Sequence, residues 1–390
     1  MKVAIVHYWL VGMRGGERVL EQMLQCYPDA DIYTHVYDRS AVSDAIAARP
    51  VRESFVGRLP GAKRHYQKYL PLMPRALEEL DLSAYDLVLS SESGPAKGVI
   101  AAPDATHICY CHSPMRYLYD HYPQYSAGMG RLQRLVFSHV AHRLRQWDLA
   151  SAARVDRFIA NSHFIARRIR RVYGRAADVV HPPVDLAAFG GGEAQPRQDF
   201  YLVVSQLVGY KRVDLAIEAV RGTDRRLIVA GKGEAMDALR ASAPENVAFL
   251  GAVPRERLIE LYATARALLF PGEEDFGIVP IEALASGCPV IALGRGGVLD
   301  TLQDGVTGTL FAEQSVPALQ AAITRFEHGD YPAETLRRIA DTYSEARFRT
   351  RFVDVVSRVM AENQERPAAG GLTAVPPAAP PRPDDPIAMA

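Results

Sequence analysis

The chain has 390 residues, 48% of them hydrophobic, with 45 basic and 45 acidic side chains. That length is two to three times a typical single domain, so two hydrophobic cores can be buried. A formal charge of zero gives no sign of a nucleic-acid partner, and no apolar stretch approaches the roughly 18 residues that a membrane-spanning helix needs.

The charge is distributed unevenly along the chain. Residues 1–185 carry 24 Lys or Arg against 18 Asp or Glu, and the remainder carries 21 against 27. A mildly basic first half suits an anionic surface or ligand, although scatter in surface charge would give the same balance. The four cysteines lack the spacing of a disulfide framework, and no signal peptide is visible. We therefore expect a cytosolic or peripheral protein, or one at the inner face of the cytoplasmic membrane.

Short β-rich runs alternate with amphipathic helical patterns from the first residues onward. The first strand is predicted at 3–7, and a helix with one apolar face follows at 17–26. Further strands of this series are predicted at 86–90, 107–111 and 157–161. A second series of strands is predicted at 200–205, 226–230, 247–250, 267–270 and 289–292. Two such alternating series are typical of two doubly wound α/β domains with parallel sheets.

The boundary between the two series falls in a segment of small and polar residues at 190–196, which has the composition of a linker. The first domain is therefore predicted to span residues 1–190 and the second residues 196–343. Residues 344–362 have the apolar period of a helix. Residues 366–390 are rich in Pro and Ala without any apolar period, and they are predicted to form a disordered tail.

Two open parallel sheets in series imply a cleft between the domains, because ligands of such sheets bind beyond the carboxyl ends of the strands. The most informative loop follows the predicted strand at 267–270 and precedes a predicted helix near 279–286. Glu274 lies in this loop, and Glu282 lies in the first turns of the helix. The free backbone N–H groups at the start of the helix suit a diphosphate or sugar hydroxyls. They belong to Phe276, Gly277, Ile278 and Val279.

The complete string from residue 270 to residue 291 resembles the E-x7-E signature of retaining glycosyltransferases with the GT-B fold, in the large family often called group 1 or family 4. The resemblance implies an α/β protein with two Rossmann-like domains that face each other across a cleft. It implies that Glu282 binds the ribose of a nucleotide-sugar donor and that Glu274 lies by the transferred hexose. The helix at 344–362 would then cross back to the first domain.

The segment at 203–214 resembles the part of the family that follows the first strand of the second domain and usually offers an Arg and a Lys to the donor diphosphate. Lys211 matches the Lys, but Gln206 stands at the position of the Arg. Gln brings no charge, so the phosphates are expected to be less well neutralised. Arg212 is a candidate to compensate, although adjacent side chains on one element usually diverge.

The first half carries looser resemblances to the same family. Gly15 and Gly16, between the first strand and the first helix, resemble a Gly-Gly loop that lets the backbone approach the donor phosphates. A plain strand–helix turn is the alternative. Residues 110–116 resemble a segment whose histidine contacts the donor sugar, and this implies a catalytic-site role for His112. A structural role is the alternative for that residue.

No metal or other cofactor is expected. The Cys and His residues at 107–112 lack a second pair of ligands, and their alternation fits a buried strand that ends in a loop. The only Asp-x-Asp motif, Asp29-Ala30-Asp31, follows the first helix rather than a strand of the predicted donor domain. It is interpreted as a surface turn.

Two basic amphipathic stretches, at 63–75 and 131–145, mix Arg, Lys and His with apolar residues. Such stretches can rest on an anionic leaflet, where lipid-linked acceptors are found, and solvated helix faces are the equally weighted alternative. The partners expected are therefore a nucleotide-sugar donor, a saccharide or polyprenyl-linked acceptor, and a peripheral contact with an anionic membrane.

The combined prediction is a retaining, metal-independent glycosyltransferase. Residues 112–116 and 208–214 resemble bacterial mannosyltransferases of surface-polysaccharide assembly, which implies GDP-mannose as the donor. A UDP-hexose is the second possibility. Two other classes remain open: a sugar-nucleotide epimerase, which would need no acceptor, and a non-catalytic sugar-nucleotide sensor, against which the intact pair Glu274 and Glu282 argues.

Overall fold

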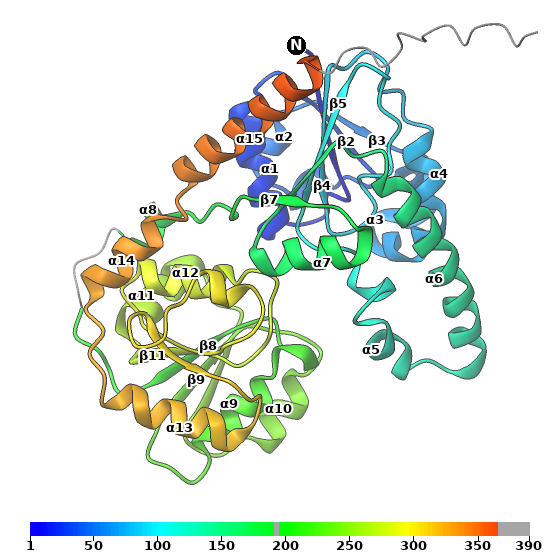
Figure 1. Cartoon of the computed structure of the whole chain (residues 1–390). Helices are drawn as coiled ribbons and strands as arrows, with labels where there is room; N and C mark the ends of the chain where they lie inside the picture. Colours follow the sequence, from blue (N-terminus) through cyan, green and yellow to red (C-terminus); the bar gives the residue numbers. More distant parts are fainter. Residues whose placement is uncertain (191–194, 366–390) are drawn as a thin grey trace, which may run out of the picture.

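The computed structural model describes residues 1–190 and 195–365. Figure 1 shows two α/β domains, the first in blue to green and the second in green to orange. The predicted disordered tail at 366–390 and most of the predicted linker lie outside the described residues.

The first domain is built on a seven-stranded parallel sheet with the order β3-β2-β1-β4-β5-β6-β7. Its strands are β1 (Val3–His7), β2 (Asp31–Thr34), β3 (Val51–Glu53), β4 (Leu87–Glu92), β5 (Thr106–Cys111), β6 (Arg157–Ala160) and β7 (Ala177–Val179). Its helices are α1 (Gly15–Cys26), α2 (Asp44–Ala47), α3 (Ala62–His65), α4 (Met73–Glu78), α5 (Tyr122–Ala127), α6 (Arg131–Ala152) and α7 (His163–Tyr173). Strands β1, β4 and β5 are buried along their whole length, as strands covered on both faces must be.

The second domain is built on a six-stranded parallel sheet with the order β10-β9-β8-β11-β12-β13. Its strands are β8 (Tyr201–Val204), β9 (Leu227–Ala230), β10 (Val247–Gly251), β11 (Ala267–Phe270), β12 (Val290–Leu293) and β13 (Gly308–Phe311). The helices of this half are α8 (Leu186–Gly190), α9 (Val213–Val220), α10 (Met236–Ser242), α11 (Arg255–Thr264), α12 (Ile278–Ala285), α13 (Val316–Glu327) and α14 (Ala333–Asp341). Two doubly wound sheets in series confirm the predicted fold class.

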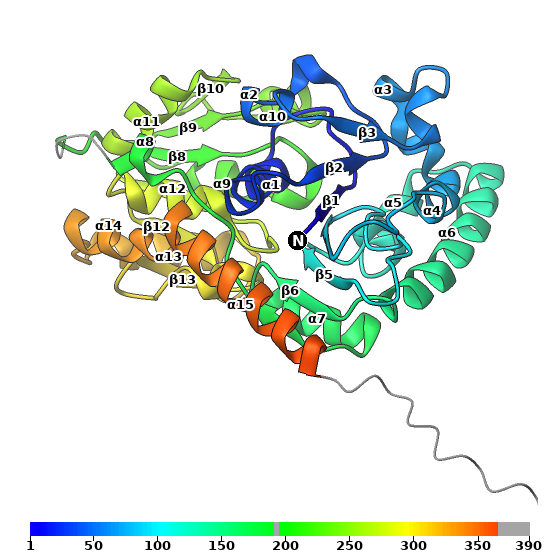
Figure 2. The same cartoon turned by 90° about the horizontal axis from the view of Figure 1, so that it is seen from above.

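The last helix, α15 (Glu345–Glu365), follows the second domain in the chain but lies along the first. In Figures 1 and 2 it runs beside the first domain, and in Figure 1 its orange half lies beside α1 and its red end lies near the N-terminus. Its buried side chains Phe348, Phe352, Val356 and Val359 belong to the same apolar cluster as residues of β1 and α1. The helix therefore ties the two ends of the chain together through hydrophobic contact.

All nine strands predicted from the sequence are present, within two residues at each end. Four strands were not predicted, namely β2, β3, β7 and β13, and each has only three or four residues. The Asp29-Ala30-Asp31 motif was interpreted as a surface turn, and this is wrong in part because Asp31 opens β2. Asp31 accepts a hydrogen bond from Tyr85 there, so its carboxylate has a structural partner.

Candidate active site

A cavity of about 720 Å³ lies between the carboxyl ends of the two sheets. On the first-domain side its walls include Tyr8 after β1, Ser93 after β4 and His112 after β5. On the second-domain side they include Ser205 after β8 and Glu274 after β11. Both domains therefore contribute strand-end loops to one cavity, as the topology requires.

The loop between β11 and α12 forms one wall of the cavity, and Phe276, Gly277, Ile278 and Val279 all line it. Gly277 has φ of +93°, in the left-handed region that favours glycine, and α12 begins at the next residue. In the described part of the chain, no hydrogen bond joins the amides of these four residues to another element. The N-terminus of α12 therefore offers donors and a partial positive charge to the cavity.

Glu274 lines the cavity and forms an ion pair with Lys211. Its backbone is fixed from behind, because its carbonyl oxygen accepts a hydrogen bond of 2.8 Å from the amide of Gly297. The Gly296-Gly297 turn therefore supports the loop that carries Glu274. A carboxylate and an ammonium group are held side by side at the cavity wall.

Of the three polar residues after β8 that were predicted to bind the donor, only two reach the cavity. Lys211 and Gln206 both line the cavity, and the Gln206 side chain is exposed. Arg212 does not line it. Arg212 has φ of +53°, and its guanidinium group bonds to Asp214 at 3.0 Å and to Gln314 at 3.2 Å. The structure thus brings Lys211 and Gln206 to the cavity and turns Arg212 toward neighbouring groups.

Gly15 and Gly16 also line the cavity, at the N-terminus of α1. A Cβ atom on Gly15 would lie 2.8 Å from Cδ1 of Ile278, the first residue of α12. A Cβ atom on Gly16 would overlap the hydroxyl group of Tyr8. A side chain at Gly15 would therefore have to displace Ile278 of the second domain, and one at Gly16 would have to displace the Tyr8 hydroxyl group.

His112 lines the cavity and stands at the end of a chain of polar contacts in the first domain. Its Nε2 lies 2.9 Å from Oγ of Ser91, which lies 3.1 Å from Nδ1 of His7. Nε2 of His7 is 3.7 Å from Oε1 of Glu17, within ion-pair distance but too long for a hydrogen bond. Burial lowers the pKa of His112 to about 3, so its imidazole is neutral at physiological pH.

Glu282 lies on α12 but does not line the cavity. The Tyr262 hydroxyl donates a hydrogen bond of 3.2 Å to its carboxylate. Burial raises the pKa of Glu282 to about 7, against smaller opposing effects from the Tyr262 hydrogen bond and from Arg255 and Arg18. The two carboxylates of the signature therefore differ in their surroundings. Glu274 lies beside the Lys211 ammonium group at the cavity wall, and Glu282 is largely removed from water.

Asp275 joins the two domains beside the cavity, and no local sequence pattern points to this role. Its carboxylate accepts hydrogen bonds from Arg116 (3.0 Å, Nε) and from Arg168 (3.1 Å), both of the first domain. Its carbonyl oxygen accepts a hydrogen bond of 2.5 Å from Ser162, which also caps α7. These contacts attach the loop that carries Glu274 to the first domain.

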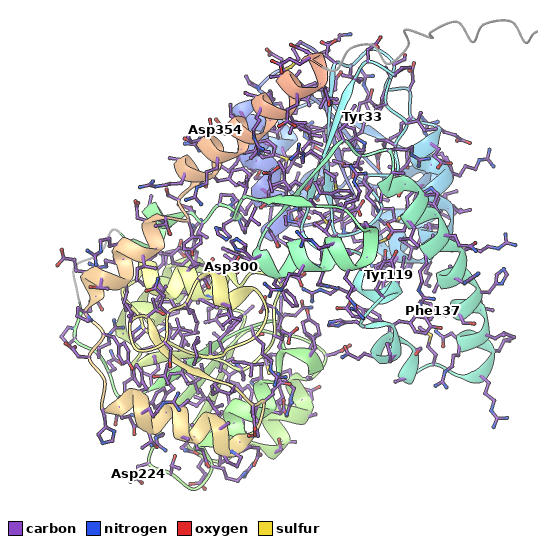
Figure 3. The ribbon with its side chains drawn as sticks, in the orientation of Figure 1. Tyr33, Tyr119, Phe137, Asp224, Asp300 and Asp354 are labelled. Atoms are coloured by element: carbon purple, nitrogen blue, oxygen red, sulfur yellow. The ribbon has the colours of Figure 1, made fainter. Side chains whose placement is uncertain are left out.

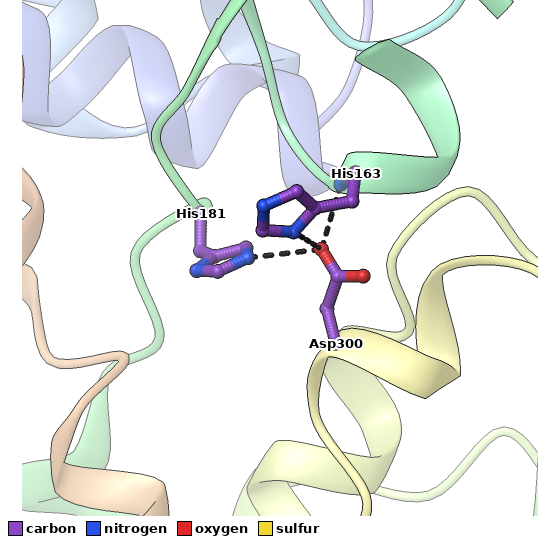
Figure 4. Close-up of side chains that lie close together, drawn as sticks. All are labelled: His163, His181 and Asp300. Atoms are coloured by element: carbon purple, nitrogen blue, oxygen red, sulfur yellow. Dashed lines mark hydrogen bonds and ion pairs between the residues drawn. The ribbon is translucent and has the colours of Figure 1, made fainter. Parts of the chain in front are cut away.

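A second junction between the domains is formed by His163, His181 and Asp300 (Figure 4). One carboxylate oxygen of Asp300 lies 3.0 Å from Nδ1 of His163, 3.1 Å from Nε2 of His181 and 2.7 Å from the His163 amide. Burial acts to raise the pKa of Asp300, but the hydrogen bonds from His181 and His163 hold it below its usual range. His181 also stacks on Phe276, with ring centroids 5.5 Å apart.

Figure 3 shows how these groups are distributed: Asp300 lies where the two domains meet, whereas Phe137 lies on the α6 side of the first domain. Phe137 lines the cavity and stacks on Tyr122 of α5. The cavity therefore extends from the interdomain junction toward α5 and α6.

Two doubly wound domains with a shared cavity at their strand ends define the class of protein: the chain has the GT-B fold. Residues 13–188 match the model of glycosyltransferase family 4, and residues 189–344 match that of glycosyl transferases group 1. The chain belongs to this family of glycosyltransferases, as the signature around Glu274 and Glu282 predicted.

Among curated relatives, the D-inositol 3-phosphate glycosyltransferase of Mycobacterium sp. (strain KMS) is 34% identical over 179 residues, or 40% of this chain. The match spans about two fifths (41%) of that protein's length. Among solved structures, sucrose-phosphate synthase from Thermosynechococcus elongatus matches with a TM-score of 0.69 at 16% identity, over 93% of this chain and 100% of that one. An Anabaena protein, HepE, in complex with UDP-glucose matches with a TM-score of 0.63 at 16% identity, over 92% and 100% of the two chains.

None of the helices in the described ranges is long and apolar enough to cross a membrane. The four cysteines are free thiols. Among the described residues, the only group of His, Cys, Asp and Glu side chains close enough together to hold a metal ion is that of His163, His181 and Asp300.

Proposed function

We propose that this chain transfers a hexose from a nucleoside diphosphate sugar to an acceptor with retention of configuration. The observation that carries this proposal is the cavity onto which the N-termini of α1 and α12 converge, with Lys211, Glu274 and His112 at its walls. Two helix N-termini and a lysine suit a diphosphate, and a carboxylate with a neutral imidazole suits sugar hydroxyls.

The reaction builds negative charge on the departing nucleoside diphosphate and positive charge on the hexose. The Lys211 ammonium and the amides of residues 276–279 would offset the negative charge, and Glu274 would lie by the hexose. We assign no protein nucleophile. The acceptor would attack from the face that the phosphate leaves, and the phosphate would accept the acceptor's proton. This scheme needs no metal ion.

For the donor we propose GDP-mannose, on the resemblance of residues 112–116 and 208–214 to bacterial mannosyltransferases. A UDP-hexose is the second candidate, because the structurally similar HepE was solved with UDP-glucose. A thermal-shift screen of nucleoside diphosphate sugars distinguishes the two, since a ligand that binds only the folded state raises the melting temperature. GDP-mannose is expected to give the largest shift. A larger shift with UDP-glucose would reject it, and no shift with any sugar nucleotide would reject the donor site.

Turnover separates transfer from the epimerase alternative. With labelled donor, a transferase is expected to move label to a lipid-linked or saccharide acceptor and to consume little donor without it. An epimerase would convert the free sugar nucleotide whether or not an acceptor is present, and that result would replace the proposal.

We further propose that the acceptor is presented at an anionic membrane surface, on the side of α5 and α6. Leu132, Leu135 and Val136 are 75%, 66% and 57% exposed, and they share one face of α6. Arg131 and Arg134 are exposed beside them. An apolar face flanked by cations suits the interface of an anionic leaflet, and Phe137 connects this part of α6 to the cavity.

Co-sedimentation with phosphatidylglycerol vesicles tests this contact. The parent protein is expected to bind these vesicles and to bind neutral phosphatidylcholine vesicles less. Replacing Leu132, Leu135 and Val136 by Ser should abolish binding, whereas Leu250→Ser, at a 40% exposed position in the second domain, should leave it intact. Equal binding by the triple variant would show that α6 does not contact the membrane.

A further inference from the structure

Three cationic side chains line the cavity: Arg14, Arg116 and Lys211. Two of them already have a carboxylate partner, because Lys211 pairs with Glu274 and Arg116 pairs with Asp275. Arg14 differs from both. In the described part of the chain, no carboxylate lies within ion-pair distance of its guanidinium group, although its own backbone amide donates to Glu17. Its positive charge is therefore the one in the cavity that no side chain offsets.

The position of Arg14 places this charge where the two domains approach each other. Arg14 is the residue before α1, and Gly15, which follows it, is packed against Ile278 at the start of α12. Two helix N-termini already direct partial positive charge to this point. An exposed guanidinium beside them adds a full charge and up to five N–H donors that match phosphate oxygens.

Among the residues that line the cavity, the second domain offers no cation that is free of a carboxylate partner. Gln206 is exposed and lines the same cavity, but its amide is neutral. A nucleoside diphosphate carries more negative charge than Lys211 alone neutralises, and Lys211 shares its charge with Glu274. A second cation is needed on physical grounds, and Arg14 is the one available.

We propose that Arg14 of the first domain supplies the second positive charge to the donor diphosphate, in place of the charge that Gln206 does not provide. This inference rests on the proposed function and adds a binding residue to it. Because Arg14 and Lys211 belong to different domains, the diphosphate site is complete only when the domains are together. Nucleotide binding therefore favours the closed arrangement, since only that arrangement presents both cations.

Titration calorimetry of Arg14→Gln with GDP and UDP tests the proposal. Loss of one charge-assisted contact is expected to weaken both nucleotides by about tenfold or more. The control is Arg39→Gln, which removes the same charge from an exposed first-domain arginine that does not line the cavity. It should bind both nucleotides like the parent. If Arg14→Gln binds both nucleotides as tightly as the parent, the assignment is wrong. If Arg14→Gln and Arg39→Gln lose affinity equally, the loss is a general effect of net charge and the assignment is also wrong.

A rescue experiment tests whether Arg14 replaces the charge missing at Gln206. Gln206→Arg is expected to recover most of the lost affinity in the Arg14→Gln protein and to add less to the parent, where a second cation is already present. Equal gains in both backgrounds would show that the two positions act independently, and no gain in the Arg14→Gln protein would overturn the replacement.

Lys211→Ala separates failure of this inference from failure of the proposed function. If Lys211→Ala weakens GDP and UDP but Arg14→Gln does not, the donor site stands and Arg14 is not part of it. If neither variant changes the affinity for either nucleotide, the donor site itself is wrong, and the inference fails with it.

Discussion

The two domains share an architecture but differ in what they bury. Among the described residues, the first domain contains charged or titratable side chains that are at most 1% exposed, including His7, Glu92, Lys97 and Asp148. In the second domain, the polar residues that are buried to this degree or nearly so are serines and threonines. Its charged groups near the cavity, Lys211 and Glu274 among them, keep contact with solvent. The first domain therefore holds charge inside its core as well as at the cavity, whereas the second holds its charge at the cavity and the surface.

The buried charges of the first domain connect the sheet to α6, the helix whose Phe137 lines the cavity. Nζ of Lys97 lies 2.9 Å from Oε1 of Glu92, at the end of β4, and also contacts Asp148 of α6. Asp148 accepts further hydrogen bonds from Tyr119 (2.7 Å) and Tyr173 (3.0 Å). A buried ion cluster contributes little net stability when complete, but it fixes which groups meet. Here it sets the position of α6 relative to the sheet.

The largest expected effect comes from breaking this cluster. Lys97→Met leaves two buried carboxylates without their cation, and removal of one partner from a buried ion pair costs about 3–5 kcal/mol. We expect a loss of this size in the free energy of unfolding, measured by urea denaturation. Lys63→Met is the matched control, since Lys63 is 61% exposed and its ion pair with Asp38 is on the surface. It should leave stability nearly unchanged. Similar losses in the two variants would remove the contrast between the domains.

In the second domain, removing a charge should affect catalysis rather than folding. If Glu274 lies by the hexose as proposed, Glu274→Gln removes a carboxylate from the place where positive charge develops, so kcat should fall by about 10²- to 10³-fold, the scale of one lost electrostatic contact. If Glu282 binds the ribose, Glu282→Gln should mainly raise KM for the donor, because such a contact would be made in both ground and transition states.

The free nucleoside diphosphate has no hexose, so it distinguishes the proposed roles of the two carboxylates. It should bind the Glu274→Gln protein like the parent and the Glu282→Gln protein poorly. If both variants bind it normally, the ribose assignment of Glu282 is wrong. An equal loss in both would mean that the two carboxylates act on one group.

The contrast between the domains also explains what could be predicted from the sequence. Much of the second domain's candidate site follows one loop, so Glu274 and residues 276–279 were found from a contiguous string. Groups held by tertiary contact left no local pattern. The clamp of Asp275 between Arg116 and Arg168 joins residues more than 100 positions apart, and no spacing rule finds it.

The same reasoning accounts for the strands that were missed. Apart from the edge strand β10, the predicted strands have apolar runs that are buried in the sheet, whereas the missed β3 and β7 lie at the two edges of the first sheet and are only partly buried. Such short edge strands have weak patterns because one side is unpaired. Arg212 shows the limit of resemblance: its position beside Lys211 was known, but its left-handed backbone, which directs the side chain to Asp214, was not.

A smaller effect is expected at Lys211. Lys211→Ala should weaken the donor and the free nucleoside diphosphate alike, by roughly 1.5–3 kcal/mol for the loss of a charged hydrogen bond. Titration calorimetry measures both. The urea midpoint should change little, because the ammonium group is not in the core. Unchanged affinity would exclude Lys211 from the site, and a large loss of stability would contradict the view that this domain's charges serve the ligand.

Glu282 is the exception that sharpens the comparison, since it is a carboxyl group of the second domain that is largely removed from water, with a pKa raised to about 7. The raised pKa means that the folded protein holds this proton more tightly than the unfolded chain. The stabilising contribution is therefore complete below about pH 4.5, the ordinary value for Glu, and is lost as the pH rises through 7.

Nucleotide binding should show the opposite dependence on pH. A carboxylate accepts hydrogen bonds from both ribose hydroxyls, so binding requires the ionised form of Glu282. With a pKa near 7, affinity for a nucleoside diphosphate should rise about tenfold between pH 6 and pH 8. The measurement is the ratio of affinities of the parent and Glu282→Gln proteins at each pH, in which the titration of the nucleotide's own phosphates cancels. The other charged groups near the carboxyl are Arg255, Arg18 and Asp185. A ratio that does not change with pH would show that nucleotide binding does not depend on the ionisation of Glu282.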